Sequence, residues 1–140
     1  MLCIKPPVYN APETTGIYDF STGVFFSADC FGALLKDTIE KFTDIPPAML
    51  KEGMVTWATV DAPWLALAND LIFGATLDRF RQLAVRSVLS AHLPPAFGSF
   101  DLLLDHLILR GQHRHLRVPI RRRLSNYCIG QQIAQSETFF

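Results

Sequence analysis

The feature that most constrains this fold is a predicted β-hairpin whose second strand runs into a carboxylate. Residues 16–20 and 24–28 are rich in β-forming side chains, and the Ser-Thr-Gly sequence between them is typical of a tight turn. Phe25 and Phe26 are both apolar, so we expect the second strand to be covered on both faces. Asp29 follows where this strand enters a turn, which is a common way to present a ligand or a catalytic group.

Helical patterns follow the hairpin, in a region where Ala, Leu and Met are enriched. We expect a first helix over Pro47–Trp57 and a second helix that Asp61 caps, with Pro63 in its first turn. Apolar residues near helical spacing over Leu71–Ala84 predict further helix, which we expect Gly74 to divide in two. The charged residues among them predict a solvated face.

The chain then returns to a short strand and forms one more helix. Ser87–Ala91 is predicted to be a buried strand that ends at His92, and the prolines and glycine of 94–98 predict a loop. Ser99 is placed to cap a last helix over Phe100–Leu109. The order of hairpin, helices, strand and helix predicts the α/β class, in its α+β form.

Charge divides the chain into two parts, although the net charge over its 140 residues is zero. There are 7 basic and 12 acidic residues through Leu109, and 6 basic residues and 1 acidic residue after it. The first part is long enough to bury a core, whereas the second shows neither a helical nor a strand period. We therefore expect one folded domain over 1–109 and a basic, poorly ordered tail over 110–140.

Cysteine usage and the N-terminus indicate a soluble, cytoplasmic protein. Cys3, Cys30 and Cys128 are an odd set without paired spacing, which argues for a reducing compartment and against a disulfide framework. The chain has no pattern typical of an export signal, and its longest apolar window, 62–75, is too short to span a membrane. No His or Lys adjoins Cys30 to activate it, so a small buried thiol is favoured over a nucleophile.

Several other residues have both a chemical and a plain structural interpretation. Trp57 and Trp64 are expected to pack in helices, and His106 to lie at the surface or boundary of the last helix. His113 and His115 have the spacing of a metal-binding pair, but the surrounding arginines repel cations. The three arginines at 121–123 favour a solvated tail, so no specific nucleic-acid or membrane partner is expected.

Four elements of the sequence, taken in order, carry a resemblance to a known family. They are Pro12-Glu13-Thr14, Tyr18-Asp19, the run from Phe26 to Gly32 around Asp29, and Ser90-Ala91-His92. In this order they resemble the second half of a metallo-β-lactamase-fold domain, most closely the diiron branch found in flavodiiron proteins. The resemblance covers residues 8–109. It implies half of an αββα sandwich, whose sheet would expose an apolar face.

The resemblance also implies a partial metal site. It gives Asp29 the role of a carboxylate that bridges two metal ions, and His92 the role of a terminal ligand. At Asn10 the family has a histidine, and an amide oxygen is a weak ligand for zinc or iron. The family's His-x-His-x-Asp-His cluster is missing, because no histidine precedes His92. With two strong ligands, the isolated chain is expected to bind zinc or iron weakly or not at all.

Two functions of different classes follow as hypotheses. The first is an incomplete metal-dependent hydrolase or diiron-type protein that retains Asp29 and His92, is inactive alone, and has no catalytic residue that the sequence identifies. The second is a non-catalytic remnant of the fold that acts as an association module through its exposed sheet face. The expected partner is a second copy of the chain or another chain that carries the missing half-domain. Metal content distinguishes the two hypotheses.

Overall fold

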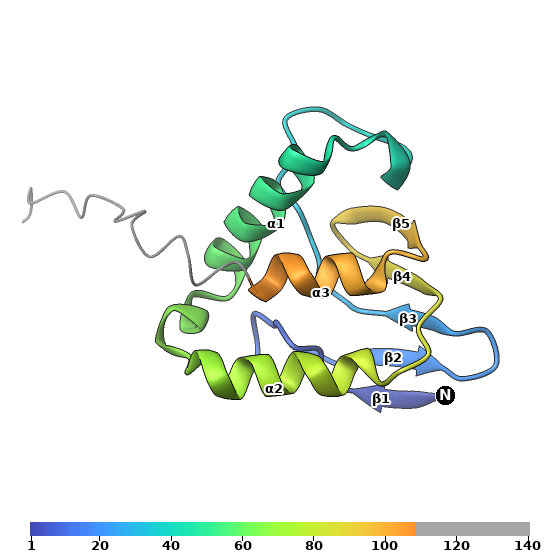
Figure 1. The fold of residues 1–140 in the computed structure, drawn as a ribbon, viewed down its shortest axis with the longest axis vertical. Coiled ribbons are helices and arrows are strands. Elements are labelled where there is room, and N and C mark those ends of the chain that lie inside the picture. Colours follow the sequence, from blue (N-terminus) through green and yellow to red (C-terminus); the bar gives the residue numbers. More distant parts are fainter. Residues whose placement is uncertain (109–140) are drawn as a thin grey trace, which may run out of the picture.

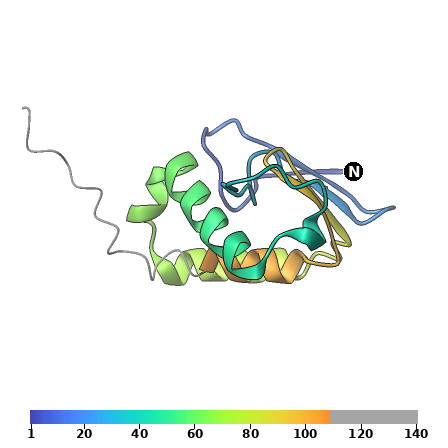
Figure 2. The same cartoon turned by 90° about the horizontal axis from the view of Figure 1, so that it is seen from above.

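The protein is described here by a computed structural model of residues 1–108, in which one sheet packs against helices. The strands, in their order across the sheet, are β1 (Leu2–Ile4), β2 (Gly16–Asp19), β3 (Val24–Phe26), β4 (Ser87–Ser90) and β5 (Leu93–Phe97). The helices are η1 (Phe42–Asp44), α1 (Pro47–Asp61), η2 (Pro63–Leu67), α2 (Asp70–Arg81) and α3 (Phe100–Ile108). The α-helices lie on one side of the sheet (Figure 1 and Figure 2). This arrangement confirms the predicted α+β class.

The sheet is mixed because the helical region connects two parallel strands. The β1–β2, β2–β3 and β4–β5 pairs are antiparallel, whereas β3 and β4 run parallel. A parallel pair needs a long crossover, and α1, η2 and α2 provide it. The predicted hairpin is confirmed, with Asp19 opposite Val24 and a turn in which Gly23 adopts φ +73°. The edge strand β1 has three residues, too few for an alternating pattern that would predict it.

The two faces of the sheet differ in burial. Side chains that are neighbours in register across β2 to β5 are buried on the helical face, namely Tyr18, Phe25, Val88 and Ala96. Phe26 points to the other face and is 45% exposed. The expectation that β3 is covered on both faces is therefore wrong, because successive side chains alternate and the described helices cover one face.

Phe25 is the centre of an aromatic cluster that joins the sheet to the helices. Its ring centroid lies 6.4 Å from that of Phe31, 5.9 Å from that of Phe80 and 6.3 Å from that of Phe100. These three rings belong to the turn after β3, to α2 and to α3. Aromatic side chains bury large apolar areas, so this cluster is a main attachment between the two layers.

The boundary predicted between the first two helices is wrong. α1 continues beyond Trp57 to Asp61, which is the last residue of that helix and not the cap of the next. The short helix η2 follows from Ala62 without a side-chain cap. The extension of α1 occurs because Ala58 and Ala62 are both buried against the core, so packing holds an additional turn.

The predicted break at Gly74 is also wrong, since α2 is continuous through it. Its buried residues, Phe73, Leu77 and Phe80, anchor the helix on both sides of the glycine. Tertiary packing therefore outweighs the low helix propensity of one glycine. Asn69 caps the helix, because its side-chain oxygen accepts hydrogen bonds from the N–H groups of Leu71 and Ile72.

The strand predicted at Ser87–Ala91 is confirmed as β4, but the loop predicted after it is the strand β5. β5 contains Pro94 and Pro95, and it tolerates them because it is an edge strand with one unpaired side. The last helix is confirmed as α3 through Ile108, whereas Leu109 and the predicted tail lie outside the described residues. Ser99 donates a side-chain hydrogen bond to the carbonyl oxygen of Phe97, at 3.1 Å.

His106 is buried, which contradicts the expectation of a surface or boundary position. It is 8% exposed, and its Nδ1 atom has no hydrogen-bond partner among residues 1–108. Burial lowers the pKa of the imidazole, the positive charge of Lys51 lowers it further, and Asp105 opposes both effects. The apolar neighbours Leu103, Leu104 and Leu107 place this face of α3 in the core, so His106 is held neutral there.

We predict that stability falls on mild acidification through His106. In the unfolded chain this imidazole gains a proton as the pH falls through 6.5, whereas the folded protein resists that proton to lower pH. The stability that depends on a neutral His106 is thus fully present above pH 6.5 and is lost as the pH falls below that value. Urea unfolding between about pH 7 and pH 5 should show a smaller decrease for His106→Leu than for the wild type. Parallel decreases in the two proteins would contradict this assignment.

Candidate functional site

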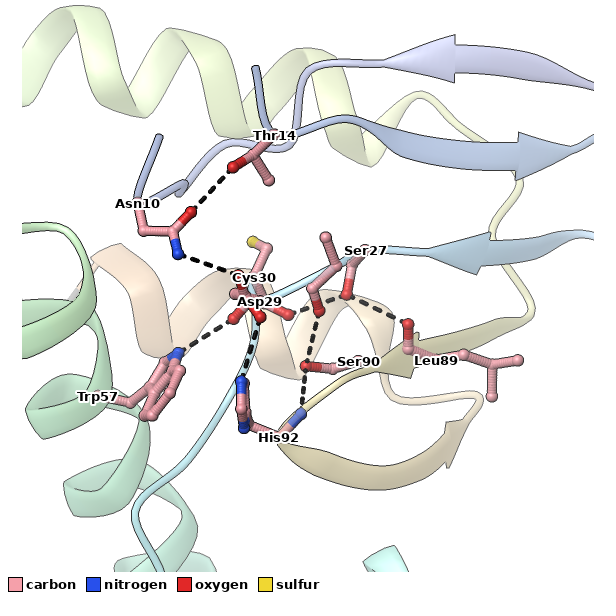
Figure 3. A network of polar contacts seen from close by, with 10 residues as sticks. Asn10, Thr14, Ser27, Asp29, Cys30, Trp57, Leu89, Ser90 and His92 are labelled. Atoms are coloured by element: carbon pink, nitrogen blue, oxygen red, sulfur yellow. Dashed lines mark hydrogen bonds and ion pairs between the residues drawn. The ribbon is translucent and has the colours of Figure 1, made fainter. Parts of the chain in front are cut away.

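The ends of β3 and β4 bring together residues that are far apart in the sequence. These strands are parallel neighbours, so both chains leave the sheet at the same edge. Backbone hydrogen bonds continue past β3, from Ser27 N–H to Leu89 O and from Ala91 N–H to Ala28 O, each at 2.9 Å. As Figure 3 shows, Asp29 and His92 therefore lie side by side at this edge.

Asp29, His92 and Asn10, the three residues that the sequence predicted as ligands, meet in one place. Asp29 Oδ1 lies 3.1 Å from His92 Nε2, and Asn10 Nδ2 donates a hydrogen bond of 3.2 Å to Asp29 Oδ2. The side chain of Thr14 donates to Asn10 Oδ1 at 2.9 Å. The Asn10 oxygen is thereby occupied, so this residue presents an amide N–H to the carboxylate. Asp29 and His92 are partly open to solvent, with 27% and 44% of their side chains exposed.

Trp57, on α1, contacts both principal residues of the site. Its Nε1 donates a hydrogen bond of 3.0 Å to the backbone oxygen of Asp29, and its ring centroid lies 4.2 Å from that of His92. Gly32 makes this approach possible, because a Cβ atom there would lie 2.5 Å from Trp57 Nε1. The sequence indicated helix packing for Trp57 and not this role. A glycine three residues beyond Asp29 was the signal of a close neighbour.

The turn that carries Asp29 has an unusual backbone. Ala28 and Phe31 adopt positive φ angles of 52° and 65°, a region that residues with a side chain rarely occupy. The Ser27 hydroxyl donates to the Cys30 carbonyl oxygen at 2.8 Å, and the Cys30 N–H donates to Ser27 O at 3.1 Å. Such strain persists where the surroundings fix the conformation, and it is common at functional sites. Here it sets the direction in which the Asp29 side chain leaves the strand.

Asp61 is a second carboxylate near the site, and sequence reasoning assigned it a capping role. It lies one helical turn after Trp57 on α1, so both side chains share a face. Its Oδ2 atom is buried without a hydrogen-bond partner among the described residues. Burial raises the pKa of the Asp61 carboxyl, the charge of Asp29 raises it further, and His92 opposes this.

Cys30 follows Asp29 and is a small buried thiol, as predicted. The residue is fully buried, and burial is the main cause that raises the pKa of its thiol to about 12. A thiol that stays protonated is a poor nucleophile and a poor metal ligand. The remaining candidates, His113, His115 and the arginines at 121–123, lie outside the described residues.

The donor set at this edge is smaller than a complete metal centre requires. A carboxylate and an imidazole at one sheet edge suit zinc or iron, but a catalytic zinc site has three protein ligands. Among residues 1–108, no three His, Cys, Asp or Glu side chains stand close enough to hold an ion together.

None of the helices in this part of the chain is long and apolar enough to cross a membrane. No family model, curated protein or solved structure matches this chain.

Proposed function

We propose that this chain is an incomplete, metallo-β-lactamase-like metal-binding protein, inactive alone, in which Asp29 and His92 form part of a zinc or iron site. The observation that carries the proposal is their contact, 3.1 Å between side chains that are 63 positions apart. Both side chains stand in the turns that follow β3 and β4, and backbone hydrogen bonds between these two chain segments fix the position of the donors. Trp57 supports both of them from α1.

The missing donors define the partner in this proposal. Residues 1–108 bring one carboxylate and one imidazole into direct contact at the site, and in this proposal the further histidines come from another chain that carries the absent half-domain. A complete centre of this class supplies an activated water for hydrolysis or, as a diiron pair, a site for oxygen or nitric oxide. The residues of this chain would then hold and orient the metal, with Asp29 bridging and His92 as a terminal ligand.

Metal titration tests the proposal directly. We predict weak binding of Co²⁺ or Zn²⁺ to the purified chain, reduced at least about tenfold in Asp29→Ala and in His92→Ala, since each removes one of two strong ligands. Isothermal titration calorimetry or cobalt absorption measures the affinity. Asp37→Ala, which removes an exposed carboxylate elsewhere, is the matched control and should bind as the wild type does. Equal affinities in all four proteins would refute the proposed ligands.

A second candidate function, association through the sheet, rests on a different observation. The outward face carries one apolar residue on each of four adjacent strands in register, namely Cys3, Ile17, Phe26 and Leu89. Phe97 on β5 is 72% exposed on the same side. A sheet with one solvated face normally presents polar side chains there, so an apolar face favours a second sheet packed on it.

The purified chain should therefore self-associate through this face when no other partner is present. We predict that Phe26→Thr shifts sedimentation velocity profiles toward monomer, because it removes a large apolar side chain from the centre of the stripe. Val60→Thr changes a more exposed apolar residue on α1, 68% exposed, and should leave the profile unchanged. A monomeric wild type, or an equal shift in both variants, would exclude this face as the association surface.

A further inference from the structure

A second surface, separate from the site, is a groove beside the first turns of α2. Its volume is about 540 Å³, and it lies between the segment that follows β1 and the helices η2 and α2. The rings of Tyr9 and Trp64 line it with centroids 4.8 Å apart, and Trp64 Nε1 donates to Tyr9 O at 2.7 Å. Lys5 Nζ lies 3.9 Å from the Tyr9 ring centroid. These contacts make a firm, mainly apolar wall.

The rim of this groove is unusually apolar for a surface exposed to water. Leu67 and Ile72 line the groove and are 91% and 68% exposed, and Leu71, next to Ile72 in the sequence, is 85% exposed. Single exposed leucines are normal, but three large aliphatic side chains within six positions, beside an aromatic groove, are typical of an interaction surface.

The path of the chain points to an occupant from the same molecule. α2 and α3 pack side by side and run in opposite directions, as Figure 1 shows, and Arg81 at the end of α2 bonds Asp101 in the first turn of α3 and Asp105 one turn later. The C-terminal end of α3 therefore lies beside the first half of α2, which lines the groove (Figure 1 and Figure 2). The described part of the chain therefore ends next to this surface.

The sequence of residues 109–140 complements that of residues 1–108 in charge and composition. Residues 109–140 contain 6 basic residues and 1 acidic residue, whereas residues 1–108 contain 7 basic and 12 acidic residues. The segment also contains three closely spaced aliphatic residues, Leu116, Val118 and Ile120. The eight residues from 109 to 116 can span up to about 26 Å. That exceeds the length of α2, about 18 Å for its 12 residues, so the reach suffices.

We propose that residues 109–140 dock on their own chain, with the aliphatic residues at 116–120 in the groove lined by Tyr9, Trp64 and Ile72. The interaction covers the apolar rim and brings the basic segment against the acidic body. Opposite net charges add a long-range attraction that salt weakens. This docking is independent of the metal site, and it differs from the expectation of a poorly ordered tail.

The native cysteines allow a direct test in the full chain. Cys30 is fully buried, so a nitroxide reagent applied to the Cys3→Ser variant labels Cys128. The chain contains two tryptophans, whose indole N–H signals report on Trp64 in the groove and Trp57 at the site. We expect the label to broaden the Trp64 signal at least twofold more than the Trp57 signal, and the difference to decrease in high salt.

Two variants and one mixed sample decide the outcome. Ile72→Asp, a change at an exposed position, should abolish the selective broadening, whereas Val60→Asp on α1 should retain it. A mixture of isotope-labelled chain without nitroxide and unlabelled chain with nitroxide should show no selective broadening of the Trp64 signal. Equal broadening of both indoles, persistence of the effect in Ile72→Asp, or selective Trp64 broadening in the mixture would overturn the proposal, the last by indicating a second copy in the groove.

Discussion

Replacing Phe25 with alanine is expected to cost about 3–5 kcal/mol of unfolding free energy, the usual range for a buried aromatic residue. Its ring is fully buried and lies between the rings of Phe31, Phe80 and Phe100. The truncation leaves a cavity at the junction of β3, α2 and α3, where rigid neighbouring rings limit collapse. Domains are stable by only about 5–15 kcal/mol, so a loss of this size removes a substantial part of the stability.

Phe26→Ala is the matched control for this prediction. It removes the same ring from the next position of the same strand, but from the outward face, where the residue is 45% exposed. Urea unfolding followed by circular dichroism should therefore give a much smaller loss for Phe26→Ala. Similar losses at the two positions would mean that the outward face is as tightly packed as the helical face, contrary to the structure.

The sequence predicts best those elements whose signals are local. The hairpin has β-forming residues on both sides of a glycine turn, and the strand before His92 and the helix after Ser99 have clear flanking signals. The wrong predictions come from tertiary context. Gly74 is tolerated because α2 is anchored on both sides, and two prolines fit β5 because it lies at the sheet edge. The packing of α3 decides that His106 is buried.

The site is predictable in part for a related reason. Asp29 and His92 each follow a strand, and these strands are parallel neighbours whose ends meet at one edge of the sheet. The family resemblance, and not a local signal, gave the expectation that the two residues meet. Trp57 and Asp61 reach the same place from a helix whose rotation depends on how it packs. The weak amphipathic pattern of α1, which buries Leu50, Met54 and Ala58 among exposed apolar residues, does not define that rotation in the sequence.

Trp57 on α1 packs closely against Gly32, in the turn that carries Asp29. This one contact contributes both to the stability of the protein and to the geometry of the site, and the lack of a side chain at Gly32 permits it. A Cβ atom at position 32 would lie 2.5 Å from Trp57 Nε1 and 2.8 Å from two neighbouring ring carbons. An indole ring is rigid, so it must move as a whole. That movement would break its hydrogen bond to Asp29 O and its contact with the His92 ring.

We therefore predict that Gly32→Ala destabilises the protein by about 1–3 kcal/mol, the usual cost of overpacking, and weakens metal binding at Asp29 and His92. Urea unfolding and cobalt titration measure the two effects. Gly74→Ala is the matched control, since a Cβ there meets nothing within 4 Å and alanine favours the helix by about 0.5–1 kcal/mol. In a Trp57→Leu background the cost of Gly32→Ala should largely disappear, because the clashing ring is gone. An undiminished cost in that background would show that position 32 acts through something other than the tryptophan.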